Sequence, residues 1–214
     1  MRVDDSTIEA ADSTIPDDLA FLTAHHVRPI VVTPSAEAAR AWVRVLNRQS
    51  NAAVGLSGAD AALLPAATRD RMGTVQTHIL TTLTLAGYVP VIEPIAIGIG
   101  GEEIALGADE VASAIGAATE ASRVLFFHES GGVVDEETAR LIEELTPAEA
   151  LALADREDLD VSLRAAMRAA AHVVRAGVGA AQILDGRVAH AAIVELLTAR
   201  HIGTQVAGSV FIAS

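Results

Sequence analysis

Three kinds of residue are absent from the sequence or rare in it. It contains no cysteine, all 15 of its Lys+Arg residues are arginine, and aromatic residues make up 3% of it. Without cysteine there are no disulfides, thiolate metal sites or cysteine nucleophiles. Without lysine there is no compact ammonium group for phosphate contacts or for a Schiff base. Any chemistry here therefore relies on arginine, histidine, carboxylates and hydroxyls.

Positive charge is also scarce. The 28 Asp+Glu residues outnumber the cations and give a formal net charge of −13. Proteins that bind nucleic acid neutralise phosphates with a basic patch, so we expect no nucleic-acid partner. The acidic beginning of the sequence lacks the apolar core of a signal peptide, and no apolar run is long enough to span a bilayer. We therefore expect a cytoplasmic protein with no membrane partner.

The residues that are present predict an α/β protein. A chain of 214 residues with 51% hydrophobic content can bury one sizeable core. Apolar strand-like segments alternate with helical segments, a pattern typical of a mostly parallel sheet covered by helices on both faces. We expect a polar leader at residues 1–16 and a single domain at residues 17–214. Residues 135–155 are expected to form two helices separated at Thr146-Pro147, and residues 204–213 a final strand.

Polar side chains stand at the predicted ends of several strands, where parallel sheets usually bind their ligands. These residues are Thr33, Ser35, Ser57, Glu93, His128 and Glu129, with Asp109 opening a neighbouring helix. Thr33, Ser35 and Ser57 are candidate ligand contacts. A nucleophilic role for Ser57 is disfavoured, because the sequence around it lacks the spacing of a nucleophile elbow.

Several stretches carry a resemblance to a known family. They include "DDLAFLTAHHVRPIVV", "LAGYVPVIEPIAI", "IALGADEVASAIGAA" and "AGVGAAQILDGRVAHAAIVELLTARHIGT". From residue 17 onward the chain resembles the amino-acid kinase family, and within it the acetylglutamate kinases. The resemblance implies a three-layer αβα sandwich and self-association, such as a homodimer. It also implies an acyl amino acid bound towards the N-terminal half, ATP with Mg bound towards the C-terminal half, and phosphorylation of a carboxylate.

The sequence departs from the family at the positions that carry phosphoryl transfer. The family's first lysine and paired glycines have no counterpart in residues 1–16, and Thr33-Pro34-Ser35 replace a second glycine loop. By the same resemblance, Ala166 stands at the position of the second lysine, while Asp109 is retained. Phosphoryl transfer depends on positioning and on neutralising charge. These departures predict a protein that has lost phosphoryl transfer and serves as a small-ligand-binding or regulatory subunit, with a partner protein or a second copy of itself.

Two alternatives stay open. In the first, the chain is a repurposed enzyme that acts on an amino-acid-like substrate. Its catalytic residues would be Glu93, Asp109, His128 and Glu129, as an acid–base cluster or a site for a hard metal. A structural interpretation of these residues is a turn, a helix cap and two solvent-facing side chains. In the second alternative, the chain is an ATP-dependent acetylglutamate-type kinase of arginine-like or lysine-like biosynthesis, with other arginines or another subunit replacing the lysines.

Two further groups of residues have candidate binding roles. His190, Glu195 and Gly203 match, by the same resemblance, the arginine-inhibitor site of arginine-sensitive relatives. The four residues of a basic stripe, with helical spacing, are Arg164, Arg168, His172 and Arg175. Such a stripe is usually a solvated face, and anion or partner binding is the alternative.

Overall fold

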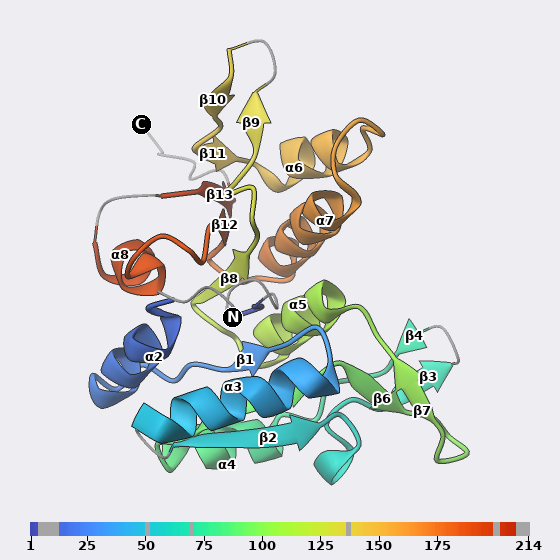
Figure 1. The fold of residues 1–214 in the computed structure, drawn as a ribbon. Coiled ribbons are helices and arrows are strands. Elements are labelled where there is room, and N and C mark those ends of the chain that lie inside the picture. Colours follow the sequence, from blue (N-terminus) through green and yellow to red (C-terminus); the bar gives the residue numbers. More distant parts are fainter. Residues whose placement is uncertain (4–12, 50–51, 69–70, 136–137, 199–201, 209–214) are drawn as a thin grey trace, which may run out of the picture.

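The computed structural model describes residues 1–3, 13–49, 52–68, 71–135, 138–198 and 202–208. It is built around a mostly parallel sheet (Figure 1). Along the sheet the order is β2 (Ala53–Ser57), β5 (Val89–Glu93), β1 (Val31–Val32), residues 1–3, β8 (Arg123–Phe127), β12 (Ala180–Leu184), β13 (Thr204–Ala207) and β11 (Glu144–Leu145). Neighbouring strands run parallel except β12 and β13, which are antiparallel.

Residues 1–3 join the two halves of this sheet. Arg2 forms a parallel bridge with Val32 on one side and with Phe126 on the other. Its backbone N–H donates to the Leu125 carbonyl at 2.8 Å, and its carbonyl accepts from the Phe127 N–H at 3.0 Å. The first residues of the expected polar leader thus lie inside the sheet, whereas residues 4–12 lie outside the described residues.

Alternate residues of the central strands face two separate cores, which gives the domain three layers. Val31, Val91 and Phe127 belong to one core, and Val32, Ile92 and Phe126 belong to the other. The first core is covered by α2 (Ile15–Ala24), α3 (Ala36–Gln49) and α8 (Ala191–Leu197). The second is covered by α4 (His78–Leu85), α5 (Ala108–Ala118), α6 (Pro147–Ala154) and α7 (Val161–Arg175). The expected three-layer αβα sandwich is therefore confirmed.

Residues 135–145 are expected from the sequence to form the first of two helices, but the described part of this range contains short strands and no helix. β9 (Val134–Asp135) pairs with β10 (Arg140–Leu141), and β11 pairs with β13. Leu145 is buried, and Ile142 packs against the core beneath α6 and α7. This packing overrides the helix propensity of the glutamate and alanine residues in the segment. The second expected helix is confirmed as α6, with a capping box between Thr146 and Glu149.

Two hairpins and a short turn complete the described chain. β6 (Ile95–Ile97) pairs with β7 (Glu103–Ala105), as the glycine-rich sequence between them predicts, and β3 (Ala66–Thr68) pairs with β4 (Arg71–Met72). A 3-10 turn spans Asp60–Ala62. The expected final strand is described for residues 204–207 only, as β13. Within the described ranges, no helix has both the length and the apolar content needed to cross a membrane.

Candidate functional site

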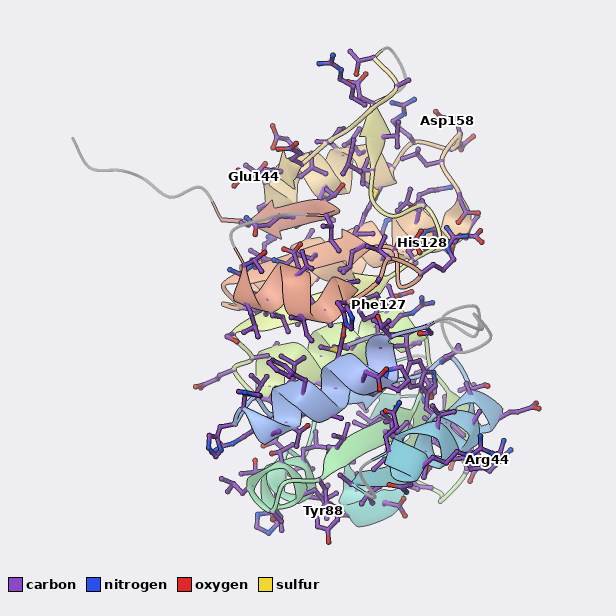
Figure 2. All side chains as sticks on the ribbon, turned by 60° about the vertical axis from the view of Figure 1, so that its left-hand side comes forward. Arg44, Tyr88, Phe127, His128, Glu144 and Asp158 are labelled. Atoms are coloured by element: carbon purple, nitrogen blue, oxygen red, sulfur yellow. The ribbon has the colours of Figure 1, made fainter. Side chains whose placement is uncertain are left out.

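The strands β2, β5, β1 and β8 end at one edge of the sheet, which we call the carboxyl edge. Ser57 and Glu93 are paired in register, and Thr33 follows the paired residues Val32 and Ile92. His128 directly follows β8. These predicted strand-end residues therefore do gather along one edge. Figure 2 shows His128 and Phe127 midway between Arg44 and Tyr88 at one end of the molecule and Glu144 and Asp158 at the other.

The hydroxyl groups of the turn between β1 and α3 form hydrogen bonds within the protein. Thr33 is fully buried, and its Oγ1 lies 3.1 Å from the carbonyl oxygens of both Ile92 and Ser35. Ser35 Oγ accepts a hydrogen bond from the Ala38 N–H at 3.1 Å and so caps α3. Pro34 between them has no N–H to offer. Both hydroxyls thus have partners in this turn, in β5 or in α3, and the expected ligand contacts of Thr33 and Ser35 stay a prediction.

Ser57 forms part of a tight turn. Its backbone N–H donates to Asp60 Oδ2 at 2.8 Å, and its Oγ accepts from the Ala59 N–H at 3.4 Å. A Cβ on Gly58 would lie 1.7 Å from the Ile95 carbonyl oxygen, so this position requires glycine. These contacts favour the structural interpretation of the Ser57-Gly58 sequence.

Arg2 and Asp109 form an ion pair at the centre of the carboxyl edge. Arg2 Nε lies 3.0 Å from Asp109 Oδ1, and the two side chains are 10% and 14% exposed. Arg2 Nη1 also donates to the Phe127 carbonyl at 3.1 Å. Asp109 lies in the first turn of α5, so the pair connects this helix to residues 1–3. The predicted catalytic residue Asp109 thus already faces a cation.

His128 is buried, with 4% of its surface exposed, and both of its ring nitrogens have partners. Nε2 lies 2.6 Å from Ser162 Oγ in the first turn of α7, and Nδ1 lies 2.9 Å from Ser130 Oγ. Asp160, the N-cap residue of α7, lies 3.7 Å from Nε2. The expected solvent-facing alternative for His128 is therefore wrong.

The hydrogen-bond directions assign the tautomer of His128. The Ser130 N–H donates to Nδ1 at 3.1 Å, which places the ring proton on Nε2. Nε2 then donates to Ser162 Oγ, and the Ser162 hydroxyl donates to Asp160 Oδ1 at 2.5 Å. The hydrogen bond from Ser162 Oγ, followed by that from the Leu163 N–H, lowers the pKa of Asp160. In this tautomer His128 acts as a donor towards Ser162 rather than as its base.

The four residues expected to act together occupy different surroundings. Asp109 faces Arg2, whereas His128 faces Ser162. Glu93 is separated from His128 by β1 and residues 1–3, and three strand spacings amount to about 14 Å. Glu129 is exposed. Among the described residues, no group of three or more His, Asp or Glu side chains is placed to hold a metal ion, and a shared catalytic role stays a prediction.

An aspartate–arginine pair links the loops that follow β8 and β12. Arg187 Nη2 lies 2.8 Å from Asp185 Oδ2 and donates to the Glu129 carbonyl at 2.7 Å. Burial raises the pKa of Asp185, but the hydrogen bonds and the positive charge of Arg187 outweigh that effect and lower it. The guanidinium of Arg187 is thus also paired with a carboxylate, although its side chain is 54% exposed.

A second group of buried acids lies around α8. Asp18 of α2 is fully buried, and its Oδ1 lies 2.8 Å from Nδ1 of His190, the N-cap residue of α8. Its Oδ2 accepts from the Ala192 N–H at 3.2 Å. Burial raises the pKa of Asp18, against the opposing effect of His190. Asp18 therefore fastens α2 to the beginning of α8.

The other two residues of the expected arginine site lie near the far end of α8. Glu195 is 2% exposed, and its Oε2 accepts from the Ile202 N–H at 3.2 Å. Gly203 is buried, and a Cβ there would lie 2.1 Å from the Ile183 carbonyl oxygen. Residues 199–201 between them lie outside the described residues. His190, Glu195 and Gly203 thus all have structural roles, and their contact with a ligand stays a prediction.

Several residues that organise this edge were not predicted from the sequence. Arg2 lies in the predicted leader, and no local pattern marks it as a partner of Asp109. Asp160 and Ser162 had a usable signal, because an aspartate two residues before a serine at the start of a long amphipathic helix is typical of a cap.

The basic stripe is partly hydrogen-bonded to the protein itself. Arg164 Nε and Arg168 Nη2 both donate to the Ala154 carbonyl at the end of α6.

Comparison with known sequences gives a consistent set of relatives. Residues 31–185 match the model of the amino acid kinase family. The chain is 35% identical over 185 residues to the acetylglutamate kinase of Symbiobacterium thermophilum, covering 78% of the chain and 63% of that protein. It is 34% identical over 215 residues to the acetylglutamate kinase of Gluconacetobacter diazotrophicus, covering 92% of the chain and 68% of that protein. The chain thus spans about two thirds of the length of these relatives.

Solved structures show the same fold at low sequence identity. N-acetylglutamate synthase from Neisseria gonorrhoeae, complexed with coenzyme A and N-acetyl-glutamate, superposes with a TM-score of 0.83 at 18% identity, over 98% of this chain and 59% of that one. The same synthase complexed with coenzyme A and L-arginine gives a TM-score of 0.76 at 17% identity, over 96% of this chain and 60% of that one. Isopentenyl phosphate kinase gives 0.67 at 12% identity, over 96% and 98% of the two chains.

Proposed function

Because the chain belongs to the amino acid kinase family, we propose that it is an acetylglutamate kinase-like member that has lost phosphoryl transfer and binds a small amino-acid-like ligand as a regulatory or partner subunit. The family match over residues 31–185 is the premise of this proposal. The loss of phosphoryl transfer is inferred from the charges at the carboxyl edge.

The pairing of Arg2 and Arg187 carries the proposal. Phosphoryl transfer requires cations that neutralise the phosphates of the nucleotide. The sequence has no lysine, and these two arginines of the carboxyl edge lie 3.0 Å from Asp109 and 2.8 Å from Asp185. A phosphate would have to compete with a carboxylate for each guanidinium. The Thr33-Pro34-Ser35 turn adds no free cradle, because its hydroxyls bond within the turn and Pro34 lacks an N–H.

An amino-acid-like ligand is supported by the relatives. The two synthase structures were solved with N-acetyl-glutamate and with L-arginine. His190, Glu195 and Gly203 resemble the arginine-inhibitor site, so L-arginine and N-acetylglutamate are the first ligands to test. The buried carboxylate of Glu195 is of the kind that a guanidinium pairs with.

The test combines ligand binding with turnover. Thermal unfolding is measured with Mg-ATP, L-arginine and N-acetylglutamate separately, and ADP formation is followed with ATP plus N-acetylglutamate. A ligand at a hundred times its Kd should raise the Tm of a protein of this size by roughly 5 to 10 °C. The proposal expects such a shift with an amino-acid ligand and no ADP formation. ADP formation that depends on N-acetylglutamate would instead support the ATP-dependent acetylglutamate-type kinase.

The repurposed enzyme is supported by one separate observation. His128 directly follows β8, is 4% exposed and lies 2.6 Å from Ser162 Oγ, and ligands of parallel sheets bind beyond the carboxyl ends of the strands. Substituting His128→Gln distinguishes this function from the regulatory one. A repurposed enzyme would lose turnover of its substrate, whereas a binding subunit whose ligand does not contact His128 would keep its ligand affinity.

A further inference from the structure

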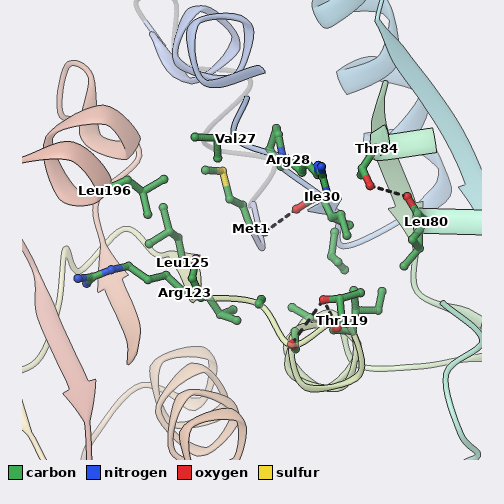
Figure 3. Close-up of a pocket in the computed structure, with 18 of the residues that line it drawn as sticks. Met1, Val27, Arg28, Ile30, Leu80, Thr84, Thr119, Arg123, Leu125 and Leu196 are labelled. Atoms are coloured by element: carbon green, nitrogen blue, oxygen red, sulfur yellow. Dashed lines mark hydrogen bonds between the residues drawn. The ribbon is translucent and has the colours of Figure 1, made fainter. Parts of the chain in front are cut away.

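A pocket of about 630 Å³ opens at the amino edge of the sheet, opposite the carboxyl edge. Figure 3 shows its labelled side chains coming from Met1, the segment before β1, α4, the C-cap of α5, β8 and α8. We call it the amino-edge pocket. It is lined at the beginning of β1 by Ile30 and at the beginning of β8 by Arg123, whereas the proposed ligand site lies at the ends of these strands. An inference about this pocket is therefore independent of the proposed function.

Apolar side chains make up most of the wall of the amino-edge pocket. Its wall includes Ile30, Leu80, Ile115, Leu125 and Leu196. Two of the threonine hydroxyls in the wall have backbone partners one helical turn away, because Thr84 Oγ1 donates to the Leu80 carbonyl at 2.8 Å and Thr119 Oγ1 to the Ile115 carbonyl at 2.7 Å. The interior thus offers apolar surface with few unmet polar groups, and its volume falls within the range of small-molecule pockets.

The charge around this pocket differs from that of the whole chain. The chain carries a formal charge of −13, yet the lining contains no Asp or Glu and includes His26, Arg28 and Arg123. Arg28 is exposed, and it forms no ion pair with another residue that the structure describes. Arg123 Nη1 donates to the neutral amide oxygen of Gln205 at 3.4 Å. Positive charge thus lies at the rim of an apolar cavity without nearby carboxylates in its wall.

From this combination we propose that the amino-edge pocket binds a medium-chain aliphatic carboxylate. The alkyl chain occupies the apolar interior, where its burial drives binding. The carboxylate lies at the rim and is attracted by the charges of Arg28 and Arg123. An uncharged ligand would gain only the first of these contributions, and a small polar amino acid would gain only the second. The pocket therefore discriminates in favour of molecules that have both parts.

The experiment uses isothermal titration calorimetry of the whole chain with decanoate and, in parallel, with decanol. Two variants address the two parts of the ligand. Arg28→Gln removes a rim charge, and Arg44→Gln on α3, an exposed arginine outside the pocket lining, is its matched control. Thr84→Phe fills part of the cavity from α4. Leu196→Phe fills part of the cavity from α8. It is used in place of Thr84→Phe if circular dichroism shows that the Thr84→Phe variant does not fold.

Decanoate is expected to bind more tightly than decanol. Arg28→Gln should weaken decanoate binding by about fivefold, the scale of an exposed ion pair, with no effect on decanol. A cavity-filling variant should weaken both ligands by more than tenfold, and Arg44→Gln should change neither. The proposal is overturned if decanoate does not bind, if decanol binds as tightly as decanoate, or if folded cavity-filling variants keep the original Kd.

Discussion

The Arg2 guanidinium lies 3.0 Å from the Asp109 carboxylate, across the boundary between the sheet and the first turn of α5. Both side chains are largely buried, so each charge contributes to compensating the other. Arg2 also bridges the two halves of the sheet through its backbone. The ion pair therefore fixes the segment on which the centre of the carboxyl edge is built.

Replacing Asp109 by asparagine should destabilise the fold. The substitution removes the negative charge opposite a guanidinium with little access to water, and we expect the free energy of unfolding to fall by about 2–4 kcal/mol. Urea unfolding followed by circular dichroism measures this change. Glu110→Gln, an exposed neighbour in the same helical turn, is the control and should stay within about 0.5 kcal/mol. Equal losses in both variants would show that the pair is not the cause.

Local pattern predicted the layers of this fold better than its loops. Successive strand residues face opposite sides of a sheet, so the sequence alone predicts that neighbours enter different cores. Val31 and Val32 do so, as do Val91 and Ile92. Strand β11 could not be assigned in this way, because it depends on pairing with the distant β13. Short strands held by non-local partners leave little periodicity to detect.

The candidate site was predicted as an edge but not as a set of contacts. Strand ends located Glu93 and His128, since parallel strands end together, and the start of a neighbouring helix located Asp109. The partners of Asp109 and His128 lie far away in sequence, at Arg2 and Ser162. Side-chain pairing across such separations is set by packing of the whole domain, and a single sequence does not encode it in a readable spacing.

The Ser162 hydroxyl should control the acidity of Asp160. Its hydrogen bond is the largest cause of the lowered pKa of Asp160, so Ser162→Ala should raise that pKa towards its ordinary value. Carboxyl ¹³C NMR titration of Asp160 measures the change. Ser113→Ala on α5 is the matched control and should leave the Asp160 titration unchanged. An unaltered Asp160 pKa in Ser162→Ala would show that the hydrogen-bond chain from His128 does not form in solution.

Asp18 and Asp185 should contribute to stability with opposite dependences on pH. Burial raises the pKa of Asp18, so the folded chain holds this proton more tightly than the unfolded chain does. Its contribution is then fully present below the ordinary pKa of 3.8 and is lost as the pH rises through the raised value. For Asp185, burial is outweighed by Arg187 and the pKa is lowered. Its contribution is fully present above 3.8 and is lost as the pH falls through the lowered value.

The variants Asp18→Asn and Asp185→Asn test these two slopes. The free energy of unfolding is measured in urea from about pH 3 to pH 6, where carboxyl groups titrate. The difference in free energy of unfolding between the original chain and Asp18→Asn should decrease as the pH rises. The difference between the original chain and Asp185→Asn should increase as the pH rises. Slopes of the same sign in the two comparisons would contradict the assigned environment of at least one carboxylate.

Substituting Gly203 tests whether this glycine is needed by the fold or by a ligand. The residue lies in the region that resembles an arginine site. A Cβ at this position would lie 2.1 Å from the Ile183 carbonyl oxygen and 3.0 Å from the Leu184 Cα, both in the backbone of β12. Gly203→Ala therefore forces β12 and the beginning of β13 apart, and we expect a loss of about 1–3 kcal/mol in the free energy of unfolding. At Gly208 nothing lies within 4 Å of an added Cβ, so Gly208→Ala is the matched control. If Gly203→Ala kept full stability but lost its response to L-arginine, the glycine would be required by the ligand and not by the strands.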